Sequence, residues 1–273
     1  MALEAMAEGA LRVVTLADEL DAAFAKAGHT FADGSPRRIG MIDIGGGLSA
    51  NYASDEVNPS FGDYAAQLRL SCPQIFDGRR VLVTEFGKAI VAKTAAIFAR
   101  IEDTLEEPVS AAAAAAAAAE PGKRPHLTAI AHAGADLLLR TAYCPDKFAH
   151  RVMILDPTGA VKSSADGPTT GQQGGGQGVC CTTVAGPLCF SGDVIASRVQ
   201  LPLSAPGDWV LVLDAGANTL SLFSRHCSRL APPVVGFRAG SATAGGGADG
   251  TGGYLLSYLK PQEELDYLLA FWG

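Results

Sequence analysis

Two short apolar runs joined by a helical pattern constrain the fold of this chain most strongly. Residues 39–44 (IGMIDI) and 80–84 (RVLVT) have the length and composition of buried strands. Residues 64–70 between them have a helical pattern, and residues 4–27 place apolar side chains along one side of a helix. Helices that alternate with buried strands are typical of a parallel sheet. The sequence therefore predicts an α/β unit in residues 1–90.

After residue 90 the pattern changes to short β-rich runs separated by turn residues. These runs are residues 91–94, 127–130, 151–155, 179–184 and 209–213. We therefore predict a β-domain over residues 91–273. Three low-complexity inserts interrupt it, at residues 110–122, 163–178 and 239–253. The alanine run of the first insert has helical propensity, but nothing in it can specify packing, so we interpret it as a surface loop without a function.

Composition and charge argue against several classes of partner. The chain is 48% apolar, which is enough for a core, and its formal net charge of −7 argues against binding to nucleic acid. No uninterrupted apolar run reaches about 18 residues, which argues against a transmembrane helix. Residues 1–11 hold two glutamates and no arginine, unlike a secretory signal or a mitochondrial transit peptide. We expect a protein of the cytoplasm or of an organellar (plastid) matrix, without a membrane partner.

The spacing of the cysteines indicates reduced thiols. The chain contains Cys72, Cys144, Cys180, Cys181, Cys189 and Cys227. They lack the paired C-x-x-C spacing of a zinc site and the density of a disulfide scaffold. We therefore predict no metal site, and an intracellular compartment.

Candidate binding and catalytic residues follow both predicted strands of the first unit. Gly45, Gly46 and Gly47 follow the first strand, where backbone N–H groups can surround an anion without obstruction by side chains. A tight turn is the alternative interpretation. Glu85 follows the second strand, and a carboxylate at the carboxyl end of a barrel strand projects into the usual mouth of an active site. A solvated carboxylate is the alternative there.

Five segments occur in a characteristic order. They are residues 43–48 (DIGGGL), 85–88 (EFGK), 140–143 (RTAY), 186–193 (GPLCFSGD) and 214–218 (DAGAN). In this order they resemble the C-terminal portion of the fold-type III pyridoxal-phosphate-dependent decarboxylases, the ornithine/diaminopimelate/arginine decarboxylase family. The resemblance implies the C-terminal strands of a TIM-like (β/α) barrel followed by a Greek-key-like β-domain. It also implies a homodimer, or a heterodimer with a full-length homologue, with active sites shared between subunits.

The same resemblance implies pyridoxal 5′-phosphate as the cofactor. In the family, the glycines surround the phosphate, and the glutamate keeps the pyridine nitrogen protonated so that the ring accepts electrons. The cofactor-binding residues implied here are Gly45, Gly46, Gly47, Glu85, Gly87, Lys88 and Asn218. Lys88 stands in place of an arginine, so the charge is kept but the bidentate fork is lost. Asn218 stands in place of a tyrosine that contacts the phosphate.

Cys189 is identified by the resemblance as the catalytic acid that one subunit offers to its neighbour. A thiol suits this role, because its ordinary pKa of about 8.5 shifts easily, although an isolated cysteine is usually a small buried hydrophobe. Arg140 is implied to bind the substrate carboxylate, with a surface arginine as the alternative. The implied substrate-binding set is Arg140, Tyr143, Phe190 and Asp193. Phe190 replaces an acidic residue that pairs with a distal ammonium, so a standard diamino acid substrate is not expected.

One element of the family pattern has no counterpart in this sequence. No lysine stands where the family places the residue that forms the Schiff base with the cofactor, and the motifs around Lys88 and Lys93 belong to the phosphate side. We therefore expect a C-terminal portion of an amino-acid decarboxylase. The alternative is a catalytically inactive homologue that acts as a binding or regulatory partner of a full-length decarboxylase.

Overall fold

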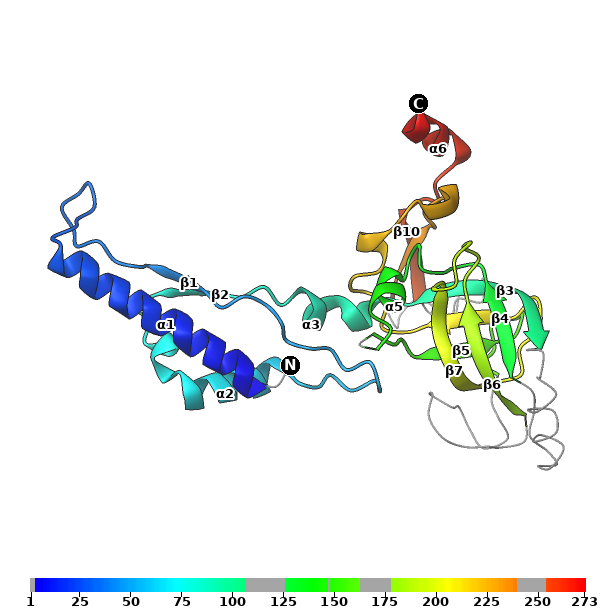
Figure 1. Cartoon of the computed structure of the whole chain (residues 1–273), viewed down its shortest axis with the longest axis horizontal. Helices are drawn as coiled ribbons and strands as arrows, with labels where there is room; N and C mark the ends of the chain where they lie inside the picture. Colours follow the sequence, from blue (N-terminus) through cyan, green and yellow to red (C-terminus); the bar gives the residue numbers. More distant parts are fainter. Residues whose placement is uncertain (1–2, 107–125, 147, 163–177, 240–253) are drawn as a thin grey trace.

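The structure is a computed structural model, which describes residues 3–106, 126–146, 148–162, 178–239 and 254–273. In the first part of the chain a long helix, α1 (Leu3–Lys26), precedes strand β1 (Met41–Asp43). Helix α2 (Phe61–Ser71) then leads to strand β2 (Val81–Val83) and the short helix α3 (Gly87–Val91). Figure 1 shows this part extending away from the β-strands that follow.

Strands β1 and β2 pair in parallel, with Ile42 opposite Leu82. Helices α1 and α2 pack together beside them, and buried side chains such as Val14, Leu48 and Leu68 form one apolar cluster with Ile42. The predicted parallel α/β unit is therefore confirmed.

Most of the remaining strands form one curved sheet. Its members are β3 (Ile97–Glu106), β4 (Leu127–Ala131), β5 (Val152–Leu155), β6 (Val179–Ala185), β7 (Val194–Pro202) and β8 (Trp209–Val212). The strand order is β5-β8-β3-β4-β6-β7, and the two edge strands contact each other, so the sheet is a nearly closed barrel. The path through this sheet does not by itself establish a Greek key, which stays a prediction. Helix α5 (Leu139–Tyr143) lies between β4 and β5 in the chain.

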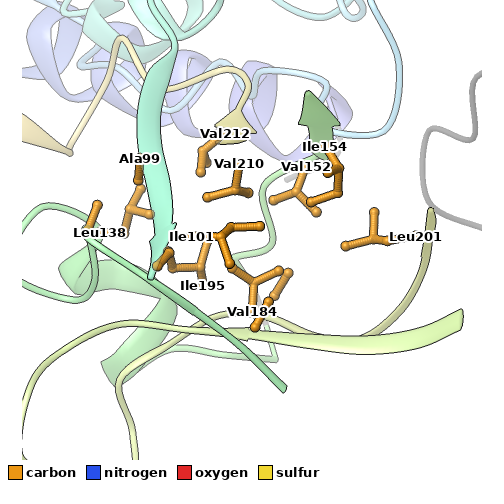
Figure 2. Close-up of a cluster of buried hydrophobic side chains, with 14 of the residues drawn as sticks. Ala99, Ile101, Leu138, Val152, Ile154, Val184, Ile195, Leu201, Val210 and Val212 are labelled. Carbon is orange, nitrogen blue, oxygen red and sulfur yellow. The ribbon is translucent and has the colours of Figure 1, made fainter. Parts of the chain in front are cut away.

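Apolar side chains from these strands converge inside the curved sheet. Figure 2 shows Ile101, Val184, Ile195 and Val210 pointing toward one another from different strands, and each is 3% exposed or less. This second cluster lies in residues 97–223, and the first in residues 3–89, so the two cores fall on either side of the predicted boundary at residue 90.

The end of the chain forms a separate hairpin and a helix. Strands β9 (Val234–Ala239) and β10 (Tyr254–Lys260) pair antiparallel, and helix α6 (Leu265–Trp272) follows. Among the described residues, no helix combines the length and the apolar character that crossing a membrane would require.

Some local predictions are wrong or incomplete. Residues 91–94, predicted as a strand, end helix α3 and form a 3₁₀ turn, since the amide of Ile90 bonds the carbonyl of Phe86 and the Thr94 hydroxyl bonds that of Val91. Strand β3 was not predicted because charged residues interrupt its apolar pattern, and β7, β9 and β10 were also not predicted. The three low-complexity inserts lie almost entirely outside the described residues.

Candidate active site

The glycine turn after β1 is built against the end of β2. The Gly45 N–H donates to Asp43 Oδ1 at 2.7 Å, and the Gly45 carbonyl accepts the Glu85 N–H at 2.9 Å. A Cβ atom at Gly46 would lie 2.4 Å from the Glu85 carbonyl oxygen, so only glycine allows this approach. Within the described part of the chain, the amides of Gly46 and Gly47 donate no hydrogen bond, and both remain available to an anion.

Two cationic side chains meet over one aromatic ring nearby. Lys88 Nζ lies 5.9 Å from the centre of the Phe148 ring, and Arg140 Cζ lies 4.5 Å from it. Desolvation, and then the charge of Arg140, lower the pKa of Lys88 below its ordinary value. Arg140 Nε is buried without a hydrogen-bond partner, and neither cation forms an ion pair with a described residue. Two neighbouring cations without a counter-charge suit an anionic ligand.

Buried ion pairs join the segment that follows α3 to the curved sheet. Asp214 follows β8 and accepts hydrogen bonds from Arg151 and Lys93, with N–O distances of 3.0 and 3.2 Å. Its side chain is 4% exposed and that of Arg151 is 9% exposed. The turn that begins at Asp214 continues to Asn218, which has a left-handed φ of 58°, a conformation that asparagine tolerates better than most residues. Sequence reasoning missed Lys93 and Arg151, since each is an ordinary surface residue until the fold pairs it.

The loop between β6 and β7 carries Cys189, and a buried carboxylate organises it. Asp193 is 3% exposed, and its two oxygens accept the N–H groups of Ala135 and Leu188, both at 2.6 Å. A Cβ atom at Gly186 would lie 2.3 Å from this carboxylate. Predicted as a substrate-binding residue, Asp193 instead faces inward with both oxygens occupied, so we assign it a positioning role.

The other predicted residues fall into two groups. Glu85 is exposed at the end of β2, Gly87 begins α3, and Tyr143 is 54% exposed at the end of α5, which also carries Arg140. The second group, Cys189 and Phe190, is exposed on the loop between β6 and β7. There the Cys189 Sγ lies 3.4 Å from Cys227 Sγ, and the Phe190 ring packs edge-on against His226 at 5.8 Å between centroids. Cys227 and His226 were not predicted as site residues.

Comparison with known proteins finds similarity to pyridoxal-dependent decarboxylases. Residues 125–216 match the family model described as the C-terminal sheet domain of pyridoxal-dependent decarboxylases. The diaminopimelate decarboxylase of Archaeoglobus fulgidus is 26% identical over 199 residues, which are 70% of this chain and 38% of the relative. That of Deinococcus radiodurans is 46% identical over 52 residues, which are 19% of this chain and 14% of the relative.

Solved structures show the same fold. The diaminopimelate decarboxylase of Helicobacter pylori, complexed with L-lysine, matches with a TM-score of 0.65 at 18% identity over 99% of this chain and 51% of that one. The enzyme of M. jannaschii, also in complex with L-lysine, matches with a TM-score of 0.67 at 19% identity over 98% of this chain and 48% of that one. The chain thus spans about half of these structures, and 38% of the A. fulgidus relative.

The cofactor of this family is pyridoxal 5′-phosphate, and the residues present fit its charged end. The unbonded amides of Gly46 and Gly47 and the unpaired cations Lys88 and Arg140 are donors suited to phosphate or carboxylate oxygens. Sequence match, fold and donor set agree, and the chain is similar to the C-terminal part of the fold-type III pyridoxal-phosphate-dependent decarboxylases.

Proposed function

We propose that this chain supplies the phosphate-binding side and the proton donor of a pyridoxal-phosphate-dependent amino-acid decarboxylase. The observation that carries the proposal is the pair of partly buried cations, Lys88 and Arg140, without a described counter-charge. The glycine turn supports it, since Gly45 and Glu85 are bonded to each other and Lys88 lies three residues after Glu85. A phosphate and a carboxylate together would neutralise both cations.

Each residue group has a separate task in this proposal. Gly45, Gly46, Gly47, Gly87, Lys88 and Asn218 hold the phosphate. Glu85 holds a proton at the pyridine nitrogen, and Arg140 binds the substrate carboxylate, with Tyr143 beside it on α5. Bound pyridoxal phosphate supplies a ring that accepts the electron pair released as carbon dioxide leaves. Cys189 then gives its thiol proton to the former Cα atom.

The proposed proton donor works across a dimer interface. Cys189 and Phe190 are exposed on a loop that Asp193 stiffens from within, so both side chains face away from this chain's own core. We propose a homodimer, or a heterodimer with a full-length homologue, in which this loop enters the neighbouring active site. The lysine that forms the Schiff base comes from outside the portion of the family pattern that this chain matches.

Phe190 bears on the substrate. The relatives described above are diaminopimelate decarboxylases, and the two solved structures among them hold L-lysine. Phe190 offers no carboxylate to a distal ammonium, and its ring is 42% exposed against His226. We propose an amino acid whose distal end is uncharged. Release of carbon dioxide from meso-diaminopimelate or ornithine at a rate equal to or above that from apolar amino acids would contradict this.

Binding of the cofactor's phosphate is the direct test. Pyridoxine 5′-phosphate, which lacks the reactive aldehyde, is expected to bind the chain, and Lys88→Gln is expected to weaken binding about 10- to 100-fold through loss of a charged hydrogen bond. Lys26→Gln, at the exposed end of α1, is the matched control. Because the pKa of Lys88 is lowered, affinity is expected to fall as the pH rises through it, earlier than an ordinary lysine would allow. Calorimetry measures both, and equal binding of pyridoxine without phosphate would refute the site.

Substitution of the proposed proton donor is expected to change the reaction rate and not the affinity for the cofactor's phosphate. In the assembled decarboxylase, Cys189→Ala is expected to lower the rate of carbon dioxide release by about 10²- to 10⁴-fold, the range of general acid catalysis. Affinity for pyridoxine 5′-phosphate is expected to stay within about twofold, because a pure proton donor contributes little to ground-state binding. A parallel loss of phosphate affinity would make Cys189 a structural residue instead.

A further inference from the structure

Three metal-ligating side chains converge beside the loop that carries the proposed proton donor. The Sγ atoms of Cys189 and Cys227 and a ring nitrogen of His226 all lie within 4.8 Å of one another, and all three residues are exposed. The two sulfurs are 3.4 Å apart and are not joined by a disulfide. Two thiols and an imidazole are a donor set that zinc prefers. The family match ends at residue 216, so it covers only one of the three.

The distances are close to those a bound zinc ion needs. With Zn–S bonds of about 2.3 Å, two thiolates of a tetrahedral site lie about 3.8 Å apart. The observed Sγ–Sγ distance of 3.4 Å is a few tenths of an ångström shorter, so a small separation of the two side chains would admit the ion. The His226 ring nitrogen lies within 4.8 Å of both sulfurs on an exposed side chain, and binding requires it to approach the ion to about 2.0 Å.

Both segments that carry the ligands are anchored to the fold. Asp193 holds the Cys189 loop through the amides of Leu188 and Ala135. On the other side, Arg225 precedes His226 and forms a two-point ion pair with Glu263, at 2.8 and 2.9 Å. Anchoring of this kind keeps ligands near each other before the ion arrives, which reduces the entropy lost on binding.

The two sulfurs have no competing cation bound to them. They lie within hydrogen-bonding distance of each other, at 3.4 Å, and either can be the donor. Among the described residues, no lysine or arginine forms an ion pair or hydrogen bond with either sulfur. A divalent ion would compensate both thiolates at once.

We infer that Cys189, Cys227 and His226 form a binding site for zinc or a similar thiophilic divalent cation. The ion displaces one proton from each thiol, both protons pass to solvent, and neutral His226 donates its lone pair. Three protein ligands leave the fourth position to water. If the proposed function holds, the bound ion also removes the thiol proton of Cys189, so occupancy stops proton donation and a chelator restores it.

Binding to the purified chain, kept under reducing conditions without thiols, tests the site independently of any activity. Titration is expected to show one equivalent of Zn²⁺, and Co²⁺ in its place is expected to give the thiolate charge-transfer and visible bands of a tetrahedral site. Alkylation of Cys189 by iodoacetamide, followed by mass spectrometry, is expected to slow when Zn²⁺ is present. Each of Cys227→Ser and His226→Gln is expected to weaken Zn²⁺ binding by at least about tenfold.

Cys144→Ser, which changes a partly exposed cysteine outside the cluster, is the matched control and is expected to leave Zn²⁺ affinity unchanged. The site is refuted if the Co²⁺ bands are absent, or if His226→Gln and Cys227→Ser bind Zn²⁺ as the unaltered chain does. Normal Zn²⁺ binding without phosphate binding would overturn the proposed function and leave the metal site standing. Binding of pyridoxine 5′-phosphate without Zn²⁺ binding would do the reverse.

Discussion

Asp214→Ala is expected to lower the free energy of unfolding by about 3 kcal/mol, the lower part of the range for breaking a buried ion pair from one side. The reason is that Arg151, whose side chain is 9% exposed, and Lys93 both lose their buried counter-charge. The cost is not higher, because Arg151 keeps a second carboxylate, Asp55, at 2.7 Å. Urea denaturation followed by tryptophan fluorescence measures the change.

The two carboxylates of Arg151 provide an internal control. Asp55 bonds the same guanidinium but is 92% exposed, so Asp55→Ala is expected to change stability far less than Asp214→Ala. Combining Asp214→Ala with Arg151→Met removes the stranded charge, and part of the lost stability is expected to return. Equal effects of the two aspartate substitutions would show that burial of Asp214 does not decide the energetics of this junction.

Gly216→Ala is expected to cost about 3 kcal/mol or more, at or above the upper range for overpacking. A Cβ atom there would lie 1.7 Å from the Val91 carbonyl oxygen, which is backbone and cannot rotate away. The substitution also strains the hydrogen bond from the Gly216 N–H to the Ala92 carbonyl, at 2.9 Å. Helix α3 carries Lys88, so the affinity for pyridoxine 5′-phosphate is expected to fall together with the stability. A loss of 1.4 kcal/mol in binding free energy corresponds to a fall in affinity of about tenfold.

The same substitution at another glycine is expected to have the opposite sign. Gly9 lies inside α1, and a Cβ atom there would have nothing within 4 Å. Gly9→Ala is therefore expected to raise stability by about 0.5–1 kcal/mol, because alanine costs less backbone entropy in a helix. If Gly216→Ala is as harmless as Gly9→Ala, then the turn after Asp214 does not pack against α3 as described.

Local periodicity was enough to predict the first unit of the fold. The apolar runs at residues 39–44 and 80–84 became the parallel strands β1 and β2, because a buried strand is recognisable from its own residues. Strand β3 was missed for the converse reason. Only Ala99 and Ile101 of its residues are buried, while Phe98 and Arg100 are exposed, as are the acidic residues that follow Ile101. Its place inside the sheet comes from pairing with β4, the next strand of the chain, and with β8, which lies far away in the chain.

The residues of the candidate site were likewise predicted only in part from the sequence. The order of the motifs indicated the glycine turn, Glu85, Lys88, Arg140 and Cys189, since each motif is a short stretch of consecutive residues. It could not indicate that Asp193 would turn inward, because that depends in part on the amide of Ala135, 58 residues away in sequence.

By itself the sequence determined which kinds of side chain are present at the site and how strands and helices alternate. Both depend on residues that are close together in the chain. Only the tertiary structure decided which charges remain unpaired over Phe148, which glycine must stay a glycine, and which second thiol faces Cys189. The physical reason is that close packing and ion pairing depend on distances of a few ångströms between segments that the sequence separates. Cys189 and Cys227 are 38 residues apart in the chain, and their sulfurs are 3.4 Å apart in the fold.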